Sequence, residues 1–195
     1  DDYLRLAYAL DCPRESPTIE LATLPSDEQA ADGVWRRLGL PAGQHVIALN
    51  SSGAFGSAKL WPSGYFTELA RQIVCDTDNS VLVLCGPSER EIARDIVAGA
   101  DHPAEESLSI GLTKACIKRS RLLVTTDSGP RHFAAAFDVP VITLFGPTHI
   151  AWSENHYARA VHLQHSVPCG PCQKRVCPLG HHQCMRDLSV DEVYR

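Results

Sequence analysis

The chain has 195 residues, of which 44% are hydrophobic, and its formal net charge is −5 at pH 7. This size and apolar content predict one globular domain with a few appendages. The acidic balance excludes a general attraction to nucleic acid or anionic lipid, so local groups must hold any anionic ligand. No apolar run reaches the roughly 20 residues that span a bilayer, and the first residues do not resemble a signal peptide. We therefore expect neither a secreted nor an integral membrane protein.

Residues 1–40 are predicted to form a connector that packs on the main domain. The elements expected there are a helix over residues 2–10, a short strand over 19–21 and a second helix over 25–38. Ser26 or Asp27 can cap the second helix.

From residue 41 onward, strands alternate with helices. Strands are expected over 46–49, 80–85, 121–125 and 140–145, and helices over 62–75, 88–99 and 129–137, with one more helix within 108–117. The strands are continuously apolar, which is typical of strands buried on both faces of a parallel sheet. The alternation predicts βαβ units and hence a Rossmann-like, doubly wound α/β fold.

Lys59 follows the first strand, in a loop rich in small residues. Gly53 and Gly56 allow backbone N–H groups to approach an anion, and Lys59 adds a positive charge close to the start of a helix. The spacing is not that of a Walker sequence. A diphosphate fits this pattern, and a solvated lysine beside a flexible loop fits it equally well.

Glu89 follows the second strand, in the sequence Gly-Pro-Ser-Glu-Arg-Glu. A carboxylate at such a position can accept hydrogen bonds from ribose hydroxyls. Acidic residues are also favoured in the first turn of a helix by the helix dipole alone, and this segment by itself favours that structural role. Of its two glutamates, Glu89 lies nearer the strand and is the preferred ribose ligand.

The richest polar turn joins the third strand to the next helix. Asp127 can bind a ribose, a sugar hydroxyl or a cation, Ser128 and the amide of Gly129 can hold a phosphate, and His132 begins the helix. A catalytic triad with Ser128 as nucleophile is disfavoured, because there is no Gly-x-Ser-x-Gly elbow and the three groups crowd into one turn. Alternatively, Asp127 or Ser128 caps the helix and His132 only packs.

Four of the eight cysteines cluster within residues 168–185, which we name the Cys-rich segment: Cys169, Cys172, Cys177 and Cys184. Without an export signal, such clustering favours metal ligands or reduced thiols over disulfides. Cys-x-x-Cys followed by two more cysteines fits a structural zinc that would staple a loop. The second half has no further Cys-x-x-Cys, so an iron–sulfur site, redox-active thiols and packed thiols without metal all stay open.

Together these motifs resemble the C-terminal half of the ADP-heptose:lipopolysaccharide heptosyltransferases, most of all the heptosyltransferase II branch. The resemblance runs from about Tyr3 to the end and is carried by Gly-Ala-Phe-Gly-Ser-Ala-Lys-Leu-Trp-Pro, Thr-Asp-Ser-Gly-Pro-Arg-His, Leu-Phe-Gly-Pro-Thr and Pro-Cys-Gly-Pro-Cys. It implies the C-terminal domain of a GT-B glycosyltransferase. Residues 41–195 would then bind the nucleotide sugar, and residues 1–40 would connect them to an acceptor-binding N-terminal domain.

The resemblance also implies a set of donor-binding residues: Gly53, Phe55, Gly56, Lys59, Glu89, Asp127, Ser128, Gly129 and His132. In it, Lys59 corresponds to a diphosphate-binding lysine and Glu89 to the residue that meets the ribose. The implied donor is ADP-heptose, the acceptor is a lipid-linked core oligosaccharide, and transfer proceeds with inversion and without a required cofactor.

The family's general base belongs to the N-terminal domain, so no catalytic residue is assigned in this sequence. We expect the chain alone to bind ADP or ADP-heptose weakly without turnover. The implied location is the cytoplasm, at most peripheral to the cytoplasmic face of the inner membrane. The alternatives are a GT-B transferase that uses another nucleotide sugar, and a metal-stabilised interaction module with a vestigial nucleotide site.

Overall fold

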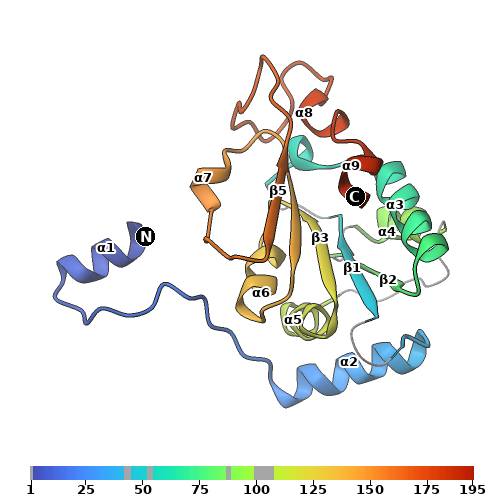
Figure 1. Cartoon of the computed structure of the whole chain (residues 1–195), viewed down its shortest axis with the longest axis horizontal. Helices are drawn as coiled ribbons and strands as arrows, with labels where there is room; N and C mark the ends of the chain where they lie inside the picture. The colour runs from blue at the N-terminus through green and yellow to red at the C-terminus, as the bar shows by residue number, and fades with distance from the viewer. Residues whose placement is uncertain (1, 42–44, 52–54, 87–88, 99–107) are drawn as a thin grey trace.

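The structure is a computed structural model that describes residues 2–41, 45–51, 55–86, 89–98 and 108–195. Within these ranges no helix is both long enough and apolar enough to cross a membrane. The elements, in chain order, are α1 (Asp2–Ala9), α2 (Pro25–Arg37), β1 (Val46–Asn50), the 3-10 helix η1 (Ser57–Lys59), α3 (Ser63–Asp76), β2 (Ser80–Leu84), α4 (Arg90–Val97), α5 (Ile110–Arg119), β3 (Leu122–Thr126), α6 (Pro130–Ala136), β4 (Val141–Phe145), α7 (Ile150–Ser153), β5 (Ala160–Gln164), α8 (Gln183–Arg186) and α9 (Val190–Tyr194) (Figure 1).

The strands form one parallel sheet in the order β2-β1-β3-β4-β5. From β1, the chain adds β2 on one side and then β3, β4 and β5 on the other. This reversal is the topological switch point of a doubly wound sheet, and such sheets bind ligands beyond the carboxyl ends of the strands at that point. The predicted Rossmann-like α/β fold is confirmed.

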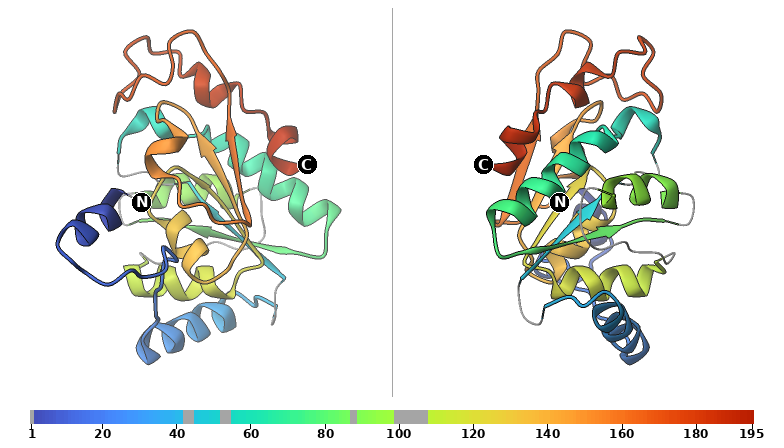
Figure 2. Two further views of the ribbon diagram at one scale, coloured as in Figure 1. Left: turned by 60° about the vertical axis from the view of Figure 1, so that its left-hand side comes forward. Right: turned by 90° about the vertical axis from the view of Figure 1, so that its right-hand side faces the viewer.

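Successive residues of β1 point to opposite faces of the sheet. Ile47 and Leu49 enter a core that includes residues of α3, α4 and α9, whereas Val46 and Ala48 enter a second core with residues of α2, α5 and α6. Figures 1 and 2 show these two groups of helices on opposite sides of the sheet. Because both faces are covered, all five β1 residues are buried, which explains the continuous apolar run.

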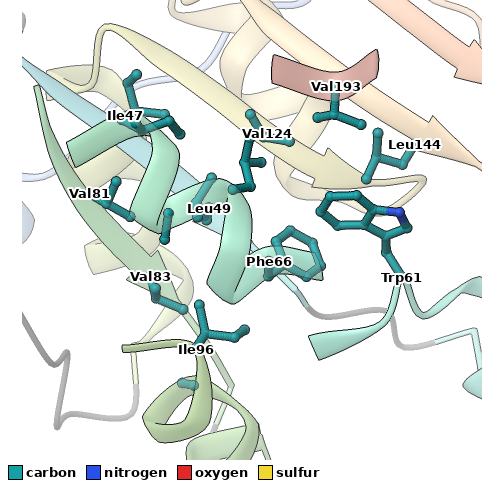
Figure 3. Close-up of a cluster of buried hydrophobic side chains, with 14 of the residues drawn as sticks. Ile47, Leu49, Trp61, Phe66, Val81, Val83, Ile96, Val124, Leu144 and Val193 are labelled. Carbon is teal, nitrogen blue, oxygen red and sulfur yellow. The ribbon is translucent and has the colours of Figure 1, made fainter. Parts of the chain in front are cut away.

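Trp61 joins the loop after β1 to the C-terminal part of the chain. Its indole Nε1 donates a hydrogen bond to the backbone carbonyl of Leu188 at 2.9 Å, and the side chain is buried. The ring packs edge-to-face on Phe66, with 4.8 Å between ring centroids, and Val193 and Leu144 lie beside it (Figure 3). Burying a large apolar side chain contributes about 1.5–3 kcal/mol, so this contact fixes the start of α3 firmly.

Residues 25–37, which form α2, pack against α5. Glu28 pairs with Lys118 at 2.9 Å and with Arg119 at 2.8 Å. Hydrogen bonds from Thr23, Lys118 and Arg119 lower the pKa of Glu28 to about 2. By contrast, α1 stands away from the sheet at the end of an irregular stretch (Figure 1).

Two local predictions are wrong. Residues 19–21 form no strand, because this stretch is largely exposed and pairs with no neighbouring strand of the described chain. Ser26 does not cap α2: the helix begins after Leu24, and Asp27 acts from inside the first turn by accepting a hydrogen bond from the Leu24 N–H at 3.0 Å. The sequence patterns also did not predict β5 or the short helices α7, α8 and α9.

Candidate functional site

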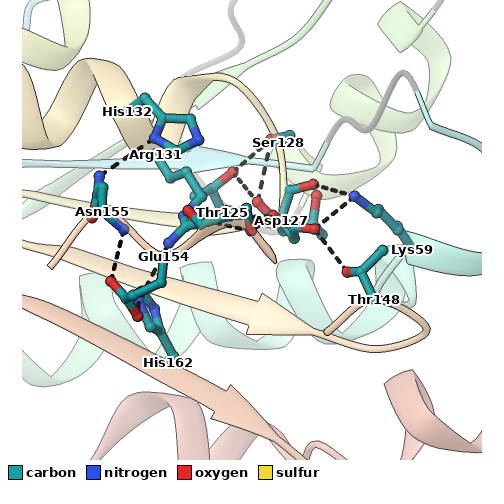
Figure 4. Close-up of polar contacts among 12 residues, drawn as sticks. Lys59, Thr125, Asp127, Ser128, Arg131, His132, Thr148, Glu154, Asn155 and His162 are labelled. Carbon is teal, nitrogen blue, oxygen red and sulfur yellow. Dashed lines mark hydrogen bonds and ion pairs between the residues drawn. The ribbon is translucent and has the colours of Figure 1, made fainter. Parts of the chain in front are cut away.

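A polar site forms where β1, β3 and β4 end at the same edge of the sheet. Asn50 closes β1, Asp127 follows β3, and Thr148 follows β4. Lys59 reaches the same place from η1. Figure 4 shows Lys59 and Thr148 meeting at the carboxylate of Asp127. The site therefore lies next to the switch point between β1 and β3, where this fold class binds ligands.

Lys59 and Asp127 form a buried ion pair at the centre of the site. The Lys59 Nζ donates to Asp127 Oδ2 at 2.7 Å and to the Asp127 backbone carbonyl at 2.9 Å, and the two side chains are only 10% and 9% exposed. Thr148 Oγ1 donates to the same Oδ2 at 2.7 Å. Burial raises the pKa of Asp127, but the hydrogen bonds from Lys59 and Thr148 outweigh it and leave the pKa below its usual value. Asp127 is therefore ionised at neutral pH.

The second carboxylate oxygen of Asp127 is also engaged. Ser153 Oγ donates to Oδ1 at 3.1 Å, and the Arg131 guanidinium lies 3.6 Å from it. Arg131 is fully buried and donates to the backbone carbonyl and the hydroxyl of Ser153 at 2.7 and 2.8 Å. Asp127 thus orients two cations, and a ligand hydroxyl that reached it would share or displace one of these partners.

Ser128 and His132, the other polar groups of this turn, face different partners. Asn50 Nδ2 donates to Ser128 Oγ at 3.2 Å, and Ser128 Oγ donates to the Thr126 carbonyl at 3.2 Å. His132 Nδ1 lies 3.4 Å from the side-chain amide of Asn155. Within the described ranges Ser128 and His132 share no hydrogen bond, which agrees with the rejection of a catalytic triad. No side chain caps α6 at its N-cap residue, Gly129, so the alternative of a capping role for Asp127 or Ser128 is wrong.

Burial, and secondarily the positive charge of Arg131, lowers the pKa of His132. The imidazole is therefore neutral at pH 7. A further chain of contacts runs behind it: the second guanidinium nitrogen of Arg131 lies 3.3 Å from His162 Nε2, which in turn lies 3.0 Å from Glu154 (Figure 4). These contacts fix the depth and direction of Arg131 beneath the site.

The loop after β1 is shaped by the Cys-rich segment. Gly56 has a backbone φ of +146°, and a Cβ added there would collide with the backbone carbonyl of Arg175. That carbonyl accepts a hydrogen bond from the Ala58 N–H at 3.0 Å. The Phe55 ring lies under Lys59, with 4.5 Å from Nζ to the ring centroid. Only glycine fits at position 56, whereas the prediction for Gly53 falls outside the described residues.

Glu89 is held within its own turn. Its Oε2 accepts a hydrogen bond from the Gly86 N–H at 2.9 Å, just before α4. In the described part of the chain Glu89 makes no hydrogen bond or ion pair with Lys59 or Asp127. Glu89 is the N-cap residue of α4, and Glu91 is the acidic residue in the first turn of that helix. The ribose role of Glu89 stays a prediction.

The four clustered cysteines surround one small cavity of ≈ 20 Å³, which Ala58 and Pro147 also line. Backbone N–H groups, His182 first, lower the pKa of Cys177, whereas burial and the neighbouring thiols raise the pKa of Cys184. All four are free thiols. Among the residues that the structure describes, no three His, Cys, Asp or Glu side chains are grouped closely enough to hold a metal ion. The zinc prediction is therefore not supported by this arrangement.

Several site residues had little signal in the sequence. Thr148 follows the fourth strand in Phe-Gly-Pro-Thr and could have been found as one more polar group at a strand's carboxyl end. Arg131 lies inside the polar motif, but its complete burial has no sequence signature. Ser153 and His162 belong to α7 and β5, elements that no periodic pattern indicated.

Known proteins are similar to this chain in sequence and in fold. The profile of Glycosyltransferase family 9 (heptosyltransferase) matches residues 2–183. Lipooligosaccharide heptosyltransferase 2 of Campylobacter jejuni is 31% identical over 166 residues, which are 77% of this chain and 49% of that protein. Lipopolysaccharide heptosyltransferase 2 of Escherichia coli K12 is 25% identical, with 98% of this chain and 58% of that protein covered. The chain thus spans about half the length of these curated relatives.

Solved structures agree on the fold. A glycosyltransferase of family 9 from Veillonella parvula matches 98% of this chain and 56% of its own with a TM-score of 0.79 at 21% identity. The ADP-heptose lipopolysaccharide heptosyltransferase II of E. coli matches 95% of this chain and 54% of its own with a TM-score of 0.72, also at 21% identity. The iron-containing heptosyltransferase TibC matches 80% of this chain and 46% of its own with a TM-score of 0.54 at 16% identity.

Proposed function

The chain belongs to glycosyltransferase family 9, the heptosyltransferase family, and on this basis we propose that it binds ADP-heptose as the donor half of a transferase that adds heptose to the lipopolysaccharide inner core. The observation that carries this proposal is the buried Lys59–Asp127 pair at the switch point of the sheet. The E. coli protein of similar fold is an ADP-heptose lipopolysaccharide heptosyltransferase, which supports the choice of donor. In this proposal residues 41–195 form the donor domain and residues 1–40 connect it to the acceptor side.

Lys59 is the proposed ligand of the donor diphosphate. Asp127 uses two of the three Nζ protons and fixes the ammonium group beside the loop of Phe55 and Gly56, which leaves one N–H for a phosphate oxygen. The Ser128 hydroxyl and the Gly129 amide lie next along the same turn. His132, held neutral by burial, is proposed to meet the sugar side of the donor through a hydrogen bond.

Glu89 is the proposed ribose ligand. Its Oε2 is held by the Gly86 N–H, so Oε1 is the oxygen that would accept from the ribose hydroxyls. The carboxylate would then be oriented by the turn that it closes. This second use of the side chain is compatible with the structural role, since a carboxylate accepts several hydrogen bonds.

The proposed chemistry is an inverting displacement. The acceptor hydroxyl oxygen attacks the anomeric carbon of the heptose, the bond from that carbon to the diphosphate oxygen breaks, and ADP leaves with the electron pair. Lys59 stabilises the negative charge that develops on the leaving phosphate, in a site where preorganised donors are most effective. No described residue is assigned the general base that takes the proton of the acceptor, so we propose that this chain alone binds the donor without turnover.

Isothermal titration with ADP tests the donor site. We expect saturable binding to the wild-type chain and at least tenfold weaker binding to Lys59→Ala, because a charge-assisted hydrogen bond to phosphate is lost. Lys114→Ala is the matched control, since Lys114 lies on α5, away from the proposed site, and its Nζ donates to the Ala22 backbone carbonyl at 2.7 Å. No heat at millimolar ADP, with Lys59→Ala indistinguishable from wild type, would refute the site.

Two further measurements delimit the proposal. A thermal-shift panel of ADP, UDP and GDP sugars asks whether the donor is an ADP sugar; a larger shift with a UDP or GDP sugar would favour a GT-B transferase of another donor class. Heptosyl transfer to lipopolysaccharide core by the chain itself would contradict the donor-only role.

The same proposal includes the acceptor and the location. The acceptor is a lipid-linked core oligosaccharide, and the protein works at the cytoplasmic face of the inner membrane.

A structural metal in the Cys-rich segment is a second, separate proposal. The four thiols share one cavity, and the N–H groups around Cys177 favour a thiolate, which is the form that binds zinc. A bound metal would tie this segment together, and it would require the thiols to come closer than they stand here. Metal analysis of protein purified under reducing conditions, with Cys169→Ser and Cys172→Ser as controls, tests it. Stoichiometric zinc without nucleotide binding would instead favour the interaction module.

A further inference from the structure

Arg175 extends from the Cys-rich segment onto the loop that carries Lys59. Its backbone carbonyl accepts the Ala58 N–H at 3.0 Å, and it lies so close to Gly56 that no Cβ fits between them. The main chain of Arg175 is therefore fixed against this loop, although the two segments are far apart in the sequence.

The side chain of Arg175 shares an aromatic ring with Lys59. Its Cζ lies 5.6 Å from the centroid of Phe55, and Lys59 Nζ lies 4.5 Å from the same centroid. Both distances fall in the range of cation–π contacts. The two cations differ in burial: Lys59 is buried beside Asp127, whereas Arg175 is exposed. The Phe55 ring thus brings a solvent-facing guanidinium to the buried ammonium group.

A doubly charged diphosphate is held best by a site that carries net positive charge. Lys59 is neutralised by Asp127 at 2.7 Å, and Arg131 is fully buried and committed to Ser153. These three groups carry a net charge of +1, on a guanidinium that is buried beneath the site, and this does not balance a doubly charged diphosphate. Arg175 has Phe55 as its side-chain contact and makes no ion pair among the described residues, so its charge is uncompensated. Guanidinium is also the cation best suited to bind two phosphate oxygens at once.

We propose that Arg175 is a further donor-binding residue, which binds the diphosphate of the nucleotide sugar beside Lys59. The proposal rests on the proposed donor site. In it, Asp127 and Lys59 supply a fixed hydrogen-bond donor, and Arg175 supplies the net positive charge that attracts and holds the anion. The Cys-rich segment then serves as the support of a ligand-binding cation, whether or not it holds a metal.

The test compares ADP and AMP binding by isothermal titration at low and high salt, for wild type, Arg175→Ala and Arg175→Lys. We expect Arg175→Ala to weaken ADP binding about 10- to 100-fold, to weaken AMP binding less, and to reduce the salt dependence of ADP binding. Arg175→Lys should recover part of the affinity, since it keeps the charge and loses the planar fork. Lys174→Ala, an exposed cation next in sequence, should stay within twofold of wild type.

The outcomes separate this inference from the donor site itself. If wild type binds ADP, Lys59→Ala does not, and Arg175→Ala equals wild type, the role of Arg175 is wrong and the donor site stands. Equal losses in Arg175→Ala and Lys174→Ala would show a diffuse charge effect and would also overturn the assignment. If wild type fails to bind ADP, both proposals fail. Unchanged circular dichroism and thermal midpoint of Arg175→Ala are expected, because the side chain is exposed.

Discussion

The Lys59–Asp127 pair makes a quantitative prediction about stability. At the observed N–O separation of 2.7 Å and an effective dielectric constant of about 20, their attraction is about 6 kcal/mol, and desolvation of the two groups offsets most of it. Removing one partner leaves the other charge buried and uncompensated. We therefore expect Asp127→Asn to lower the free energy of unfolding by about 3–5 kcal/mol.

A double-mutant cycle distinguishes a coupled pair from two independent residues. Lys59→Met alone leaves the Asp127 carboxylate with Thr148, Ser153 and the more distant Arg131, so we expect a loss of about 2–4 kcal/mol. The free energy of unfolding of the double variant should be close to that of the more stable single variant, because the double variant leaves neither charge buried without a partner. Urea unfolding followed by circular dichroism measures all four proteins. Single losses below about 1 kcal/mol that simply add would refute this account of the site.

The remaining predictions concern pH and backbone shape. The pKa of Glu28 falls from 4.5 to about 2 on folding, so its ion pairs stabilise the folded chain above pH 4.5, and this stabilisation is lost as the pH falls towards 2. The urea midpoints of wild type and Glu28→Gln should therefore differ at neutral pH and converge between pH 4.5 and 2. A difference that stays constant with pH would contradict the pairing of Glu28 with Lys118 and Arg119. Gly56→Ala should destabilise by about 1–3 kcal/mol and weaken ADP binding, through both the strained φ and the collision with Arg175; an unchanged thermal midpoint would exclude the contact.

Most of the sheet could be predicted from the sequence, because strands buried on both faces are continuously apolar and differ clearly from their surroundings. β5 is the exception. It lies at the edge of the sheet, and its residues are only partly buried, so no strong pattern marks it. The prediction of a strand over residues 19–21 was wrong, because a short stretch with apolar residues forms a strand only where a neighbouring strand can pair with it.

The sequence predicted where the residues of the site lie in the sheet, but not which side chains contact one another. Polar residues after parallel strands gather at one edge of the sheet, so Lys59 and Asp127 could be placed together from topology alone. That they would form a buried ion pair depends on side-chain depth, which sequence patterns do not encode. Arg175 illustrates the limit most clearly, since only the three-dimensional path of the Cys-rich segment brings it to Phe55.

The hydrogen bond from Trp61 to Leu188 joins residues 127 positions apart in the chain. Contacts between residues so far apart in the chain carry a large loop-closure cost, and they slow folding relative to local contacts. During synthesis, the segment around Lys59 leaves the ribosome long before Leu188 does. The start of α3, and with it the loop that we assign to the diphosphate, thus gains this contact only after Leu188 has been made, so the proposed donor site depends on both segments being present.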